Sequence, residues 1–384
     1  MDNITRRDAL GSVAASLLIV EPKTAFGYQA NSAVALGIIG TGNRGRYVGG
    51  IFAKDPRARV AAICDIEPAA LDAAKTQVPG LDKARTYADY RELLAATDLD
   101  CIFIATPIFR HPEHFEAAVA SRRHVYCEKA AAADVAGVKR VMRAGERAEK
   151  SKHIQFGFQQ RFGPEYLAAE KIVSSGQLGE MLWMRSHWIT SGQVKPRPRP
   201  AYSSLAEEKL KNWYSWKETC GDFIVEQDCH GVDVLNWYAK RRPLLASGAG
   251  GKRIRPYGDC NDHANITYEY EGGLRGCLHG CQFAQRWSLV NEQFFGTEGT
   301  VETSRQYYRW YRAPAAQGQS ATEEVRSKRE PTFDAVEYFL EHVVTGKAEN
   351  HTVNAAESTL TAMLGRMAVE SKRVVTWDEM MRTA

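Results

Sequence analysis

The sequence predicts an α/β protein with two domains: an N-terminal doubly wound parallel sheet, and a C-terminal α+β domain with an open, mostly antiparallel sheet. Three observations predict this fold class. Short apolar runs alternate with helical periodicity in the first half, a glycine-rich turn directly follows the first run, and β runs joined by Gly-rich turns fill the second half. The length of 384 residues leaves room for two cores.

The first half predicts repeated β-α units. We expect strands at 34–39, 59–64, 101–105, 123–127 and 153–158, and helices at 44–54, 68–76, 89–96, 112–121 and 134–150. Units of this length place helices on both faces of a parallel sheet, and ligands then bind at the carboxyl ends of the strands. Residues 33–157 are therefore assigned to a doubly wound Rossmann domain.

The pattern changes after Gly157, where sequential β runs replace the alternation. We expect strands near 181–189, 243–250, 263–271, 275–283, 288–295 and 299–303, and helices near 164–175, 223–238, 331–344 and 353–371. The polar span 313–330 is predicted to be a mobile loop. We assign 158–345 to an α+β domain for substrate and oligomerisation, and 346–384 to a closing helical segment.

A glycine-rich turn made of Gly40, Thr41, Gly42, Asn43, Arg44 and Gly45 follows the first apolar run, and Asp65 closes the next one. Its glycines permit a tight turn, close approach of a pyrophosphate, and close packing of the following helix. The helix N-terminus offers free N–H groups to the phosphates. Such a turn alone is often an ordinary loop, but strand, helix and acid together predict a dinucleotide site. Asp65 favours NAD over NADP, because a carboxylate accepts ribose hydroxyls and repels a 2′-phosphate.

The composition argues against nucleic-acid, membrane and metal partners. The net charge is only +4, and Lys and Arg are spread along the chain, so we expect no nucleic-acid partner. The densest basic stretch, 195–200, alternates with proline and predicts an extended, solvated loop. No apolar run reaches the roughly 20 residues needed to span a membrane. The eight cysteines include no CxxC pair and support no metal or redox centre.

The N-terminus predicts export. Arg6 and Arg7 precede a short, uncharged apolar run at 11–20, and small residues follow near 25–30. This pattern is typical of a twin-arginine signal, so we expect residues 1–32 to be a signal and linker and the protein to be periplasmic or exported. The alternative is an N-terminal arm packed on a neighbouring subunit, in a cytoplasmic protein.

Polar residues end two neighbouring strands of the predicted parallel sheet. Thr106 and Pro107 end one strand, and Glu128 and Lys129 end the next. Because ligands of doubly wound sheets bind at this edge, both positions face the cofactor. A lysine here can be an ordinary surface cation, but its place after a buried strand and beside a glutamate favours a functional role.

A second group lies on the helix predicted at 223–238, where Glu226, His230 and Asp233 are spaced to share one face. The group predicts an acid/base site facing the nicotinamide. Two alternatives stay open: a partly solvated helix with a structural histidine, and a metal site. The metal site has least support, since no further His or Cys shares the spacing.

These groups match what alcohol oxidation requires. Hydride leaves carbon for the nicotinamide, and the hydroxyl proton must go to a base. His230 suits that exchange, because a free imidazole has a pKa of about 6.5. Lys129 would stabilise developing alkoxide charge, and Glu226 would orient His230 or balance its charge.

The chain resembles the glucose–fructose oxidoreductase, inositol dehydrogenase and rhizopine-catabolism (Gfo/Idh/MocA) family over essentially all of residues 33–384. The matching stretches are 37–42, 105–107 with His111, Glu128-Lys129, 160–164, Glu226 with His230, and 294–300. The resemblance implies that Glu128 contacts the nicotinamide ribose, that Thr106, Pro107 and His111 belong to the cofactor site, and that Lys129 and His230 are catalytic.

It also implies that the closing helical segment returns to the Rossmann domain and that the protein is a homo-oligomer, a dimer or tetramer built through the open sheet. The chain departs from the family pattern at two positions that bear on the substrate geometry. Ala130 replaces the usual proline after the lysine, and Glu226 replaces the usual aspartate.

The predicted function is an NAD-dependent oxidoreductase acting on a ring hydroxyl of a sugar, glycoside or cyclitol. Since a periplasm offers no NAD pool, an exported enzyme should hold its cofactor tightly. Alternatives are an NAD-dependent glycosidase that oxidises C3 transiently, and a non-catalytic NAD(H) sensor. The candidate substrate-binding residues are Trp213, Tyr214, Trp216, Arg161 and Asp233, with His187 and Trp188 as weaker candidates. The three aromatic residues at 213–216 are equally candidates for the core of the second domain.

Overall fold

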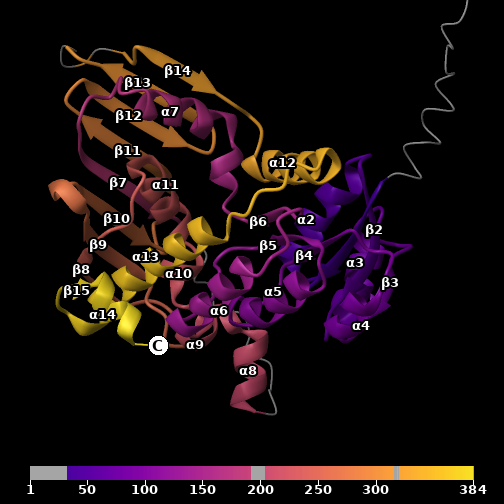
Figure 1. Cartoon of the computed structure of the whole chain (residues 1–384). Helices are drawn as coiled ribbons and strands as arrows, with labels where there is room; N and C mark the ends of the chain where they lie inside the picture. The colour runs from indigo at the N-terminus through magenta and orange to yellow at the C-terminus, as the bar shows by residue number, and fades with distance from the viewer. Residues whose placement is uncertain (1–32, 192–203, 315–317, 319, 384) are drawn as a thin grey trace, which may run out of the picture. The chain divides into compact units, whose positions relative to one another are not determined.

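The computed structural model of the chain describes residues 33–191, 204–314, 318 and 320–383 (Figure 1). The predicted export signal, 1–32, and the basic proline-rich stretch, 195–200, lie outside the described residues. Residues Val34–Ala384 form one unit. No helix among the described residues is both long and apolar enough to cross a membrane.

In the described residues, the first sheet has six parallel strands in the order β3-β2-β1-β4-β5-β6. Their bounds are β1 (Val34–Ile39), β2 (Ala58–Cys64), β3 (Arg85–Tyr87), β4 (Cys101–Ile104), β5 (His124–Cys127) and β6 (Ile154–Phe156). The predicted doubly wound parallel sheet is confirmed. The prediction missed β3, because a strand of three residues with two exposed side chains carries no apolar run.

Helices cover both faces of this sheet because its strands are apolar on both sides. On β1, Leu36 and Ile38 join one core cluster, whereas Ala35 and Ile39 join the other. The helices of this half are α2 (Asn43–Lys54), α3 (Pro68–Gln77), α4 (Tyr90–Ala95), α5 (His111–Ala120) and α6 (Val135–Glu146).

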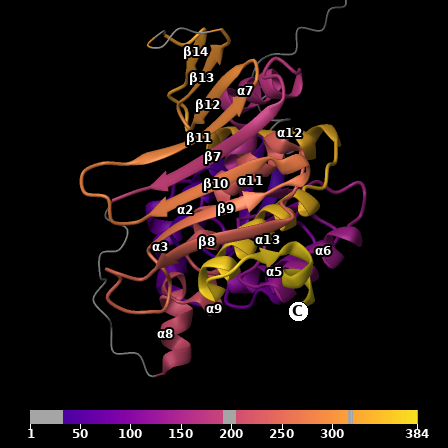
Figure 2. The same cartoon turned by 90° about the vertical axis from the view of Figure 1, so that its left-hand side faces the viewer.

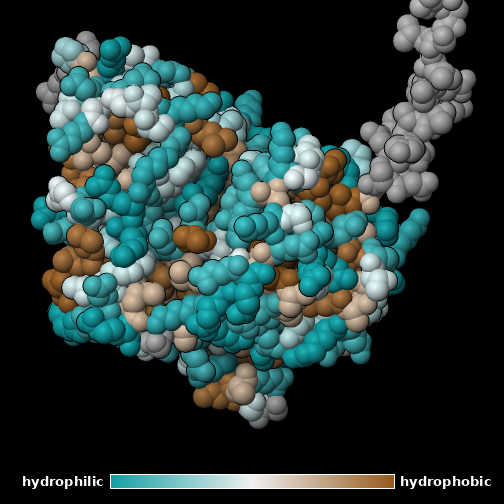
Figure 3. Space-filling view, in the orientation of Figure 1, coloured by the Kyte–Doolittle hydropathy of each residue, from teal (hydrophilic) through white to brown (hydrophobic). Residues whose placement is uncertain are grey.

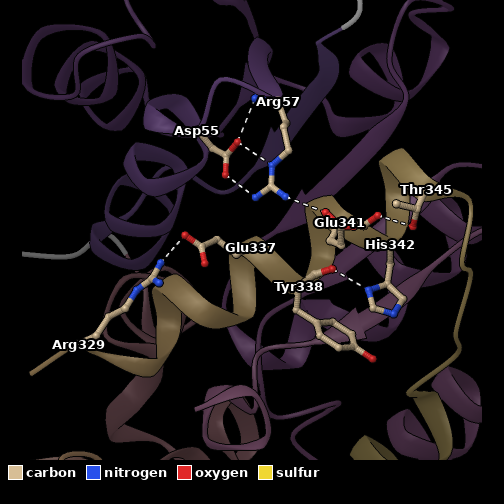
Figure 4. Close-up of polar contacts among 8 residues, drawn as sticks. All are labelled: Asp55, Arg57, Arg329, Glu337, Tyr338, Glu341, His342 and Thr345. Carbon is tan, nitrogen blue, oxygen red and sulfur yellow. Dashed lines mark hydrogen bonds and ion pairs between the residues drawn. The ribbon is translucent and has the colours of Figure 1, made fainter. Parts of the chain in front are cut away.

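Helix α12 (Pro331–Thr345) packs on this first half, although the sequence places it in the segment 158–345. Its Phe339 ring meets Phe52 of α2 and Tyr126 of β5 edge-on at 5.9 and 5.6 Å. Arg57 bridges the two segments through Asp55 and Glu341, at 2.7 and 3.2 Å (Figure 4). The domain boundaries remain predictions, but the core of the Rossmann half includes this distant helix.

In the described residues, a second sheet of nine strands follows the order β14-β13-β12-β11-β7-β10-β9-β8-β15. Every pairing is antiparallel except β7 with β10, so the predicted open, mostly antiparallel sheet is confirmed (Figure 2). The bounds are β7 (Met181–Ile189), β8 (Leu245–Gly251), β9 (His263–Glu269), β10 (Arg275–Cys281), β11 (Leu289–Gly296), β12 (Gly299–Ser304), β13 (Tyr307–Arg312), β14 (Glu323–Arg326) and β15 (Val375–Thr376).

One part of the second half was predicted wrongly. The span 313–330 is not a continuous loop, because β14 lies within it and pairs with β13. All four β14 residues are exposed, so the strand has no apolar alternation from which it could be predicted. Backbone pairing at the sheet edge, rather than burial, holds this segment.

Helices of the second half pack against this sheet or beside it. Their bounds are α7 (Pro164–Ser174), α8 (Leu205–Lys211), α9 (Lys217–Cys220), α10 (Phe223–Glu226), α11 (Cys229–Ala239), α13 (Thr352–Ser371) and α14 (Trp377–Arg382). Helix α13 contacts both α6 of the first half and β8 and α11 of the second. The surface seen in Figure 3 is mainly hydrophilic, with separate apolar patches.

The predicted helix 223–238 is two helices, α10 and α11, with a break at Gln227 and Asp228. Asp228 is fully buried and begins the second helix. A side chain at Gly280 would collide with its carboxylate, so this glycine lets β10 approach the break closely. Glu226 and His230 therefore lie on consecutive helices and not on one continuous face.

Candidate functional site

The glycine-rich turn joins β1 to α2 with the geometry of an anion cradle. Gly40 has φ of 94°, and a Cβ on Gly45 would lie 2.0 Å from the Gly40 carbonyl oxygen. Gly42 has open space where a side chain would stand, and no side chain caps the α2 N-terminus. The backbone N–H groups of this turn thus fit a diphosphate.

Asp65 lies where the sequence places it, beside this turn at the end of β2. Its Oδ2 accepts hydrogen bonds from the Thr41 backbone N–H at 2.8 Å and from the Thr41 hydroxyl at 3.2 Å. Its Oδ1 accepts from the Glu67 N–H at 3.0 Å. These bonds hold a carboxylate where the ribose hydroxyls of a dinucleotide are expected.

His111 ties two cofactor-edge loops together. Its ring nitrogens face the Ala130 carbonyl oxygen at 2.7 Å and the Thr106 carbonyl oxygen at 2.9 Å. The Thr106 hydroxyl is engaged by His114 at 2.9 Å. His111 is buried, and burial lowers its pKa. The geometry gives His111 a positioning role behind the cofactor edge, with Thr106 and Pro107 on the loop that it holds.

Arg44 connects the glycine turn to the end of β5. Its Nε donates to Glu128 Oε1 at 2.8 Å, and Glu128 is only 4% exposed. A Cβ on Gly157 would collide with the Glu128 carboxylate, so the end of β6 also packs tightly against it. Both predicted cofactor residues are thereby fixed at the carboxyl edge of the parallel sheet.

Lys129 is one of the residues through which the two halves of the chain meet. Its Nζ donates to Glu226 Oε1 at 3.0 Å and to the Glu226 backbone oxygen. Burial by itself would lower the pKa of Lys129, but the surrounding groups, Glu226 first, together outweigh burial and the pKa is raised. The Lys129–Ala130 peptide bond is cis. Lys129 is therefore a cation, a hydrogen-bond donor and not a base.

His230 is buried among aromatic rings. Trp188 stacks on it with centroids 5.3 Å apart and planes at 14°, and Phe158 meets it edge-on at 6.0 Å. Its Nδ1 has no hydrogen-bond partner in the described part of the chain. Burial, and after it the charges of Lys129, Arg305 and Arg44, lower the pKa of His230 well below its usual value. The imidazole is thus neutral near pH 7, the form that can accept a proton.

The predicted substrate residues Arg161 and Asp233 are paired with each other. The Arg161 guanidinium donates to both Asp233 oxygens at 2.8–3.0 Å, and the Ser358 hydroxyl donates to Asp233 at 2.6 Å. Asp233 is 1% exposed. The geometry favours a structural role, because this ion pair uses the polar groups that a substrate would need.

The predicted aromatic group lies in 213–216, between α8 and α9. Trp213 packs against the main core cluster, and the Lys209 ammonium lies over the Trp216 ring at 5.7 Å. The Tyr214 carbonyl oxygen accepts from Arg255 at 3.3 Å. In the described residues no hydrogen bond or ring contact joins Trp213 or Trp216 to His230. For Trp213, the core alternative has the better structural support. Trp216 is half-buried, and its indole N–H has no hydrogen-bond partner in the described residues.

The prediction missed Arg305, on the turn between β12 and β13. Its guanidinium carbon lies 5.0 Å from the centre of the Trp188 ring, beside His230. No motif surrounds it in the sequence, so only the pairing of distant strands brings it to the site. A metal centre has no support among the residues described, which include no group of three or more His, Cys, Asp or Glu arranged to hold an ion.

Comparisons with known proteins agree with this geometry. Residues 34–156 match the NAD-binding Rossmann-fold model of the Gfo/Idh/MocA oxidoreductase family, and residues 166–302 match the Gfo/Idh/MocA C-terminal domain. The chain is 24% identical to the uncharacterized oxidoreductase YrbE of Bacillus subtilis, over 70% of this chain and 73% of that protein. It is 34% identical to inositol 2-dehydrogenase 1 of Paenarthrobacter aurescens, over 38% of this chain and 43% of that protein.

Solved structures share the fold. A levoglucosan dehydrogenase in complex with NADH and levoglucosan has a TM-score of 0.76 at 17% identity, covering 90% of this chain and 99% of its own. The myo-inositol 2-dehydrogenase of Lactobacillus plantarum has a TM-score of 0.71 at 20% identity, with the same coverage. With both halves matched by the models of one family, the chain belongs to the Gfo/Idh/MocA oxidoreductases and carries their NAD-binding Rossmann domain.

Proposed function

We propose that this oxidoreductase uses NAD to oxidise a ring hydroxyl of a sugar, glycoside or cyclitol. The observation that carries the proposal is the contact of Lys129, from the end of β5, with Glu226, beside a neutral His230. Relatives whose names state inositol dehydrogenation, and a structural neighbour holding NADH and levoglucosan, support this substrate class.

His230, Lys129 and Glu226 have separate roles in the proposed oxidation. His230 takes the proton of the substrate hydroxyl, and Lys129 donates a hydrogen bond to the same oxygen as negative charge develops. NAD, when bound, supplies the hydride acceptor. Glu226 holds Lys129 in its protonated form, because its carboxylate raises the pKa of that amine.

Export and assembly stay predictions beside this proposal. The N-terminal arginine pair and apolar run support export. An exported enzyme would retain its cofactor through purification and regenerate it in each turnover. The open face of the second sheet carries the exposed Trp183, stacked on Phe295 with ring centroids 5.0 Å apart, and supports a homo-oligomer.

An activity assay tests the proposal. Purified protein is incubated with myo-inositol, free hexoses and aryl glycosides, with and without added NAD. We expect at least one polyol to reduce NAD, which gives free NADH where the cofactor exchanges and bound NADH where the enzyme retains it. Aglycone release without added NAD and without NADH formation would favour the redox-neutral glycosidase. No turnover of any compound tested, in protein that binds NAD, would favour the sensor.

The depressed pKa of His230 predicts the pH profile. A group whose pKa is lowered keeps its neutral form to lower pH, so the base stays available. We expect kcat/KM to hold between about pH 8 and about pH 6, and to fall only below that range. Arg44→Met removes one cation and leaves Glu128 unpaired, so it should move the acid limb upward. An acid limb at the ordinary value of about 6.5 in the unaltered enzyme would remove His230 as the base.

A further inference from the structure

Arg305 is a cation of the site whose charge is neutralised by no carboxylate among the residues that the structure describes. Lys129 pairs with Glu226 at 3.0 Å, and Arg44 pairs with Glu128 at 2.8 Å. Within the ranges that the structure describes, Arg305 forms no ion pair, and its buried Nε has no hydrogen-bond partner. One positive charge beside the candidate base is thus left without a partner.

The guanidinium is nevertheless held in place. It lies over Trp188, and Trp188 stacks on His230. With the Gln159 amide oriented to satisfy both of its ends, the amide oxygen accepts from Arg305 Nη2 at 3.1 Å, and its nitrogen donates to the Gly157 oxygen at 2.7 Å. Arg305 is therefore anchored by Trp188 and Gln159, while its Nε has no acceptor in the described residues.

An alternative counter-charge is Glu292, a buried acid of β11 whose pKa the Arg305 charge lowers. It accepts hydrogen bonds from the Tyr166 and Thr303 hydroxyls at 3.1 and 3.0 Å, and not from Arg305. Burial raises the pKa of Glu292 to about 8, so this carboxyl is mainly protonated at neutral pH. It leaves the Arg305 charge uncompensated.

Two other partly buried arginines, Arg123 and Arg161, have acceptors for their guanidinium nitrogens. The Arg123 guanidinium donates to three backbone carbonyls, those of Leu94, Ala96 and Leu99. Arg161 is paired through two nitrogens with Asp233. A buried guanidinium nitrogen without a partner costs free energy unless a ligand supplies an acceptor.

From these contacts we propose that Arg305 binds a carboxylate carried by the substrate, so that the preferred substrate is a sugar acid or a glycoside of one. The inference rests on the proposed function and names its substrate class. A planar guanidinium matches a carboxylate in shape and in single charge. The cofactor diphosphate already has its cradle at the glycine turn, on the other half of the chain.

The test compares sugars that differ only at C6: D-glucuronate with D-glucose, and D-galacturonate with D-galactose. We expect kcat/KM to favour the acids by about 10- to 150-fold, the range for a charge-assisted hydrogen bond. Arg305→Met should remove this preference, measured as the ratio of kcat/KM for acid and neutral sugar, while the Kd for NAD stays nearly constant. Because the Arg305 charge also lowers the pKa of His230, the acid limb should move upward for both sugars and leave the ratio as the readout. Arg305→Lys should restore part of the preference.

Arg185→Met is the matched control. Arg185 also lies over a tryptophan, Trp183, and also donates to a glutamine, Gln293, but on the open face of the second sheet. It should keep the preference for acids. Equal kcat/KM for acids and neutral sugars would overturn the inference and leave the proposed function standing.

Calorimetry with NAD-loaded protein separates the two proposals when no sugar turns over. Weaker binding of D-glucuronate by Arg305→Met than by the unaltered protein would support the inference alone, and equal binding would overturn it. Tighter binding of glucose 6-phosphate than of glucuronate would overturn the carboxylate assignment. A loss of NAD affinity in Arg305→Met would assign the residue to the cofactor instead.

Discussion

Lys129→Met is expected to lower kcat by about 100- to 1,000-fold, the effect of removing one donor that stabilises a developing oxyanion. His230→Asn should lower it by about 100- to 10,000-fold, because the proton then has no base. Both variants should still bind NAD, since the glycine turn and Asp65 are untouched. Steady-state kinetics and a fluorescence titration with NADH measure the two properties separately.

Two control variants have matched chemistry elsewhere in the fold. The Lys217 Nζ pairs with Glu370 Oε1 at 2.8 Å. His279, on β10, has its Nδ1 2.8 Å from Oδ1 of Asn265 on β9. Lys217→Met and His279→Asn should retain near-normal kcat. Near-normal kcat in Lys129→Met or His230→Asn would exclude that residue from the mechanism, whatever its position.

Arg161→Met should destabilise the protein by about 3–5 kcal/mol, because it leaves the Asp233 charge buried without its partner. Asp233→Leu removes the other half of the pair and leaves the Ser358 hydroxyl and Arg161 without their acceptor. The double variant should lose clearly less than the sum of the two single losses, since neither charge is then stranded. Denaturant unfolding of the four proteins measures this coupling.

An exposed ion pair is the control for this prediction. Arg85 and Asp98 lie 2.7 Å apart with about half of each side chain in solvent, 47% and 52%. Asp98→Ala should change stability by less than about 1 kcal/mol. The same set also distinguishes the two roles of Asp233. If Asp233 binds substrate, the double variant loses substrate affinity even where its stability recovers, and the structural assignment is then wrong.

The sequence predicted the features that neighbouring residues encode. The glycine turn follows from steric demands within six residues, and the buried strands on either side of it are continuous apolar runs. The positions of Asp65, Glu128 and Lys129 follow from the rule that parallel strands end at one edge. The sequence predicts one helix at 223–238, because the apolar spacing continues across the break. At the break, buried Asp228 packs closely against Gly280 of a distant strand.

By itself, then, the sequence determined the order of elements, the dinucleotide turn and the candidate lysine and histidine, since each depends on short-range pattern. Only the tertiary structure decided which charges neutralise one another. Lys129 meets Glu226 across 97 positions of the chain, and Arg161 meets Asp233 across 72. A carboxylate looks the same in a sequence whether it binds a ligand or a neighbouring guanidinium. Its partner, and hence its role, depends on how distant helices and strands pack.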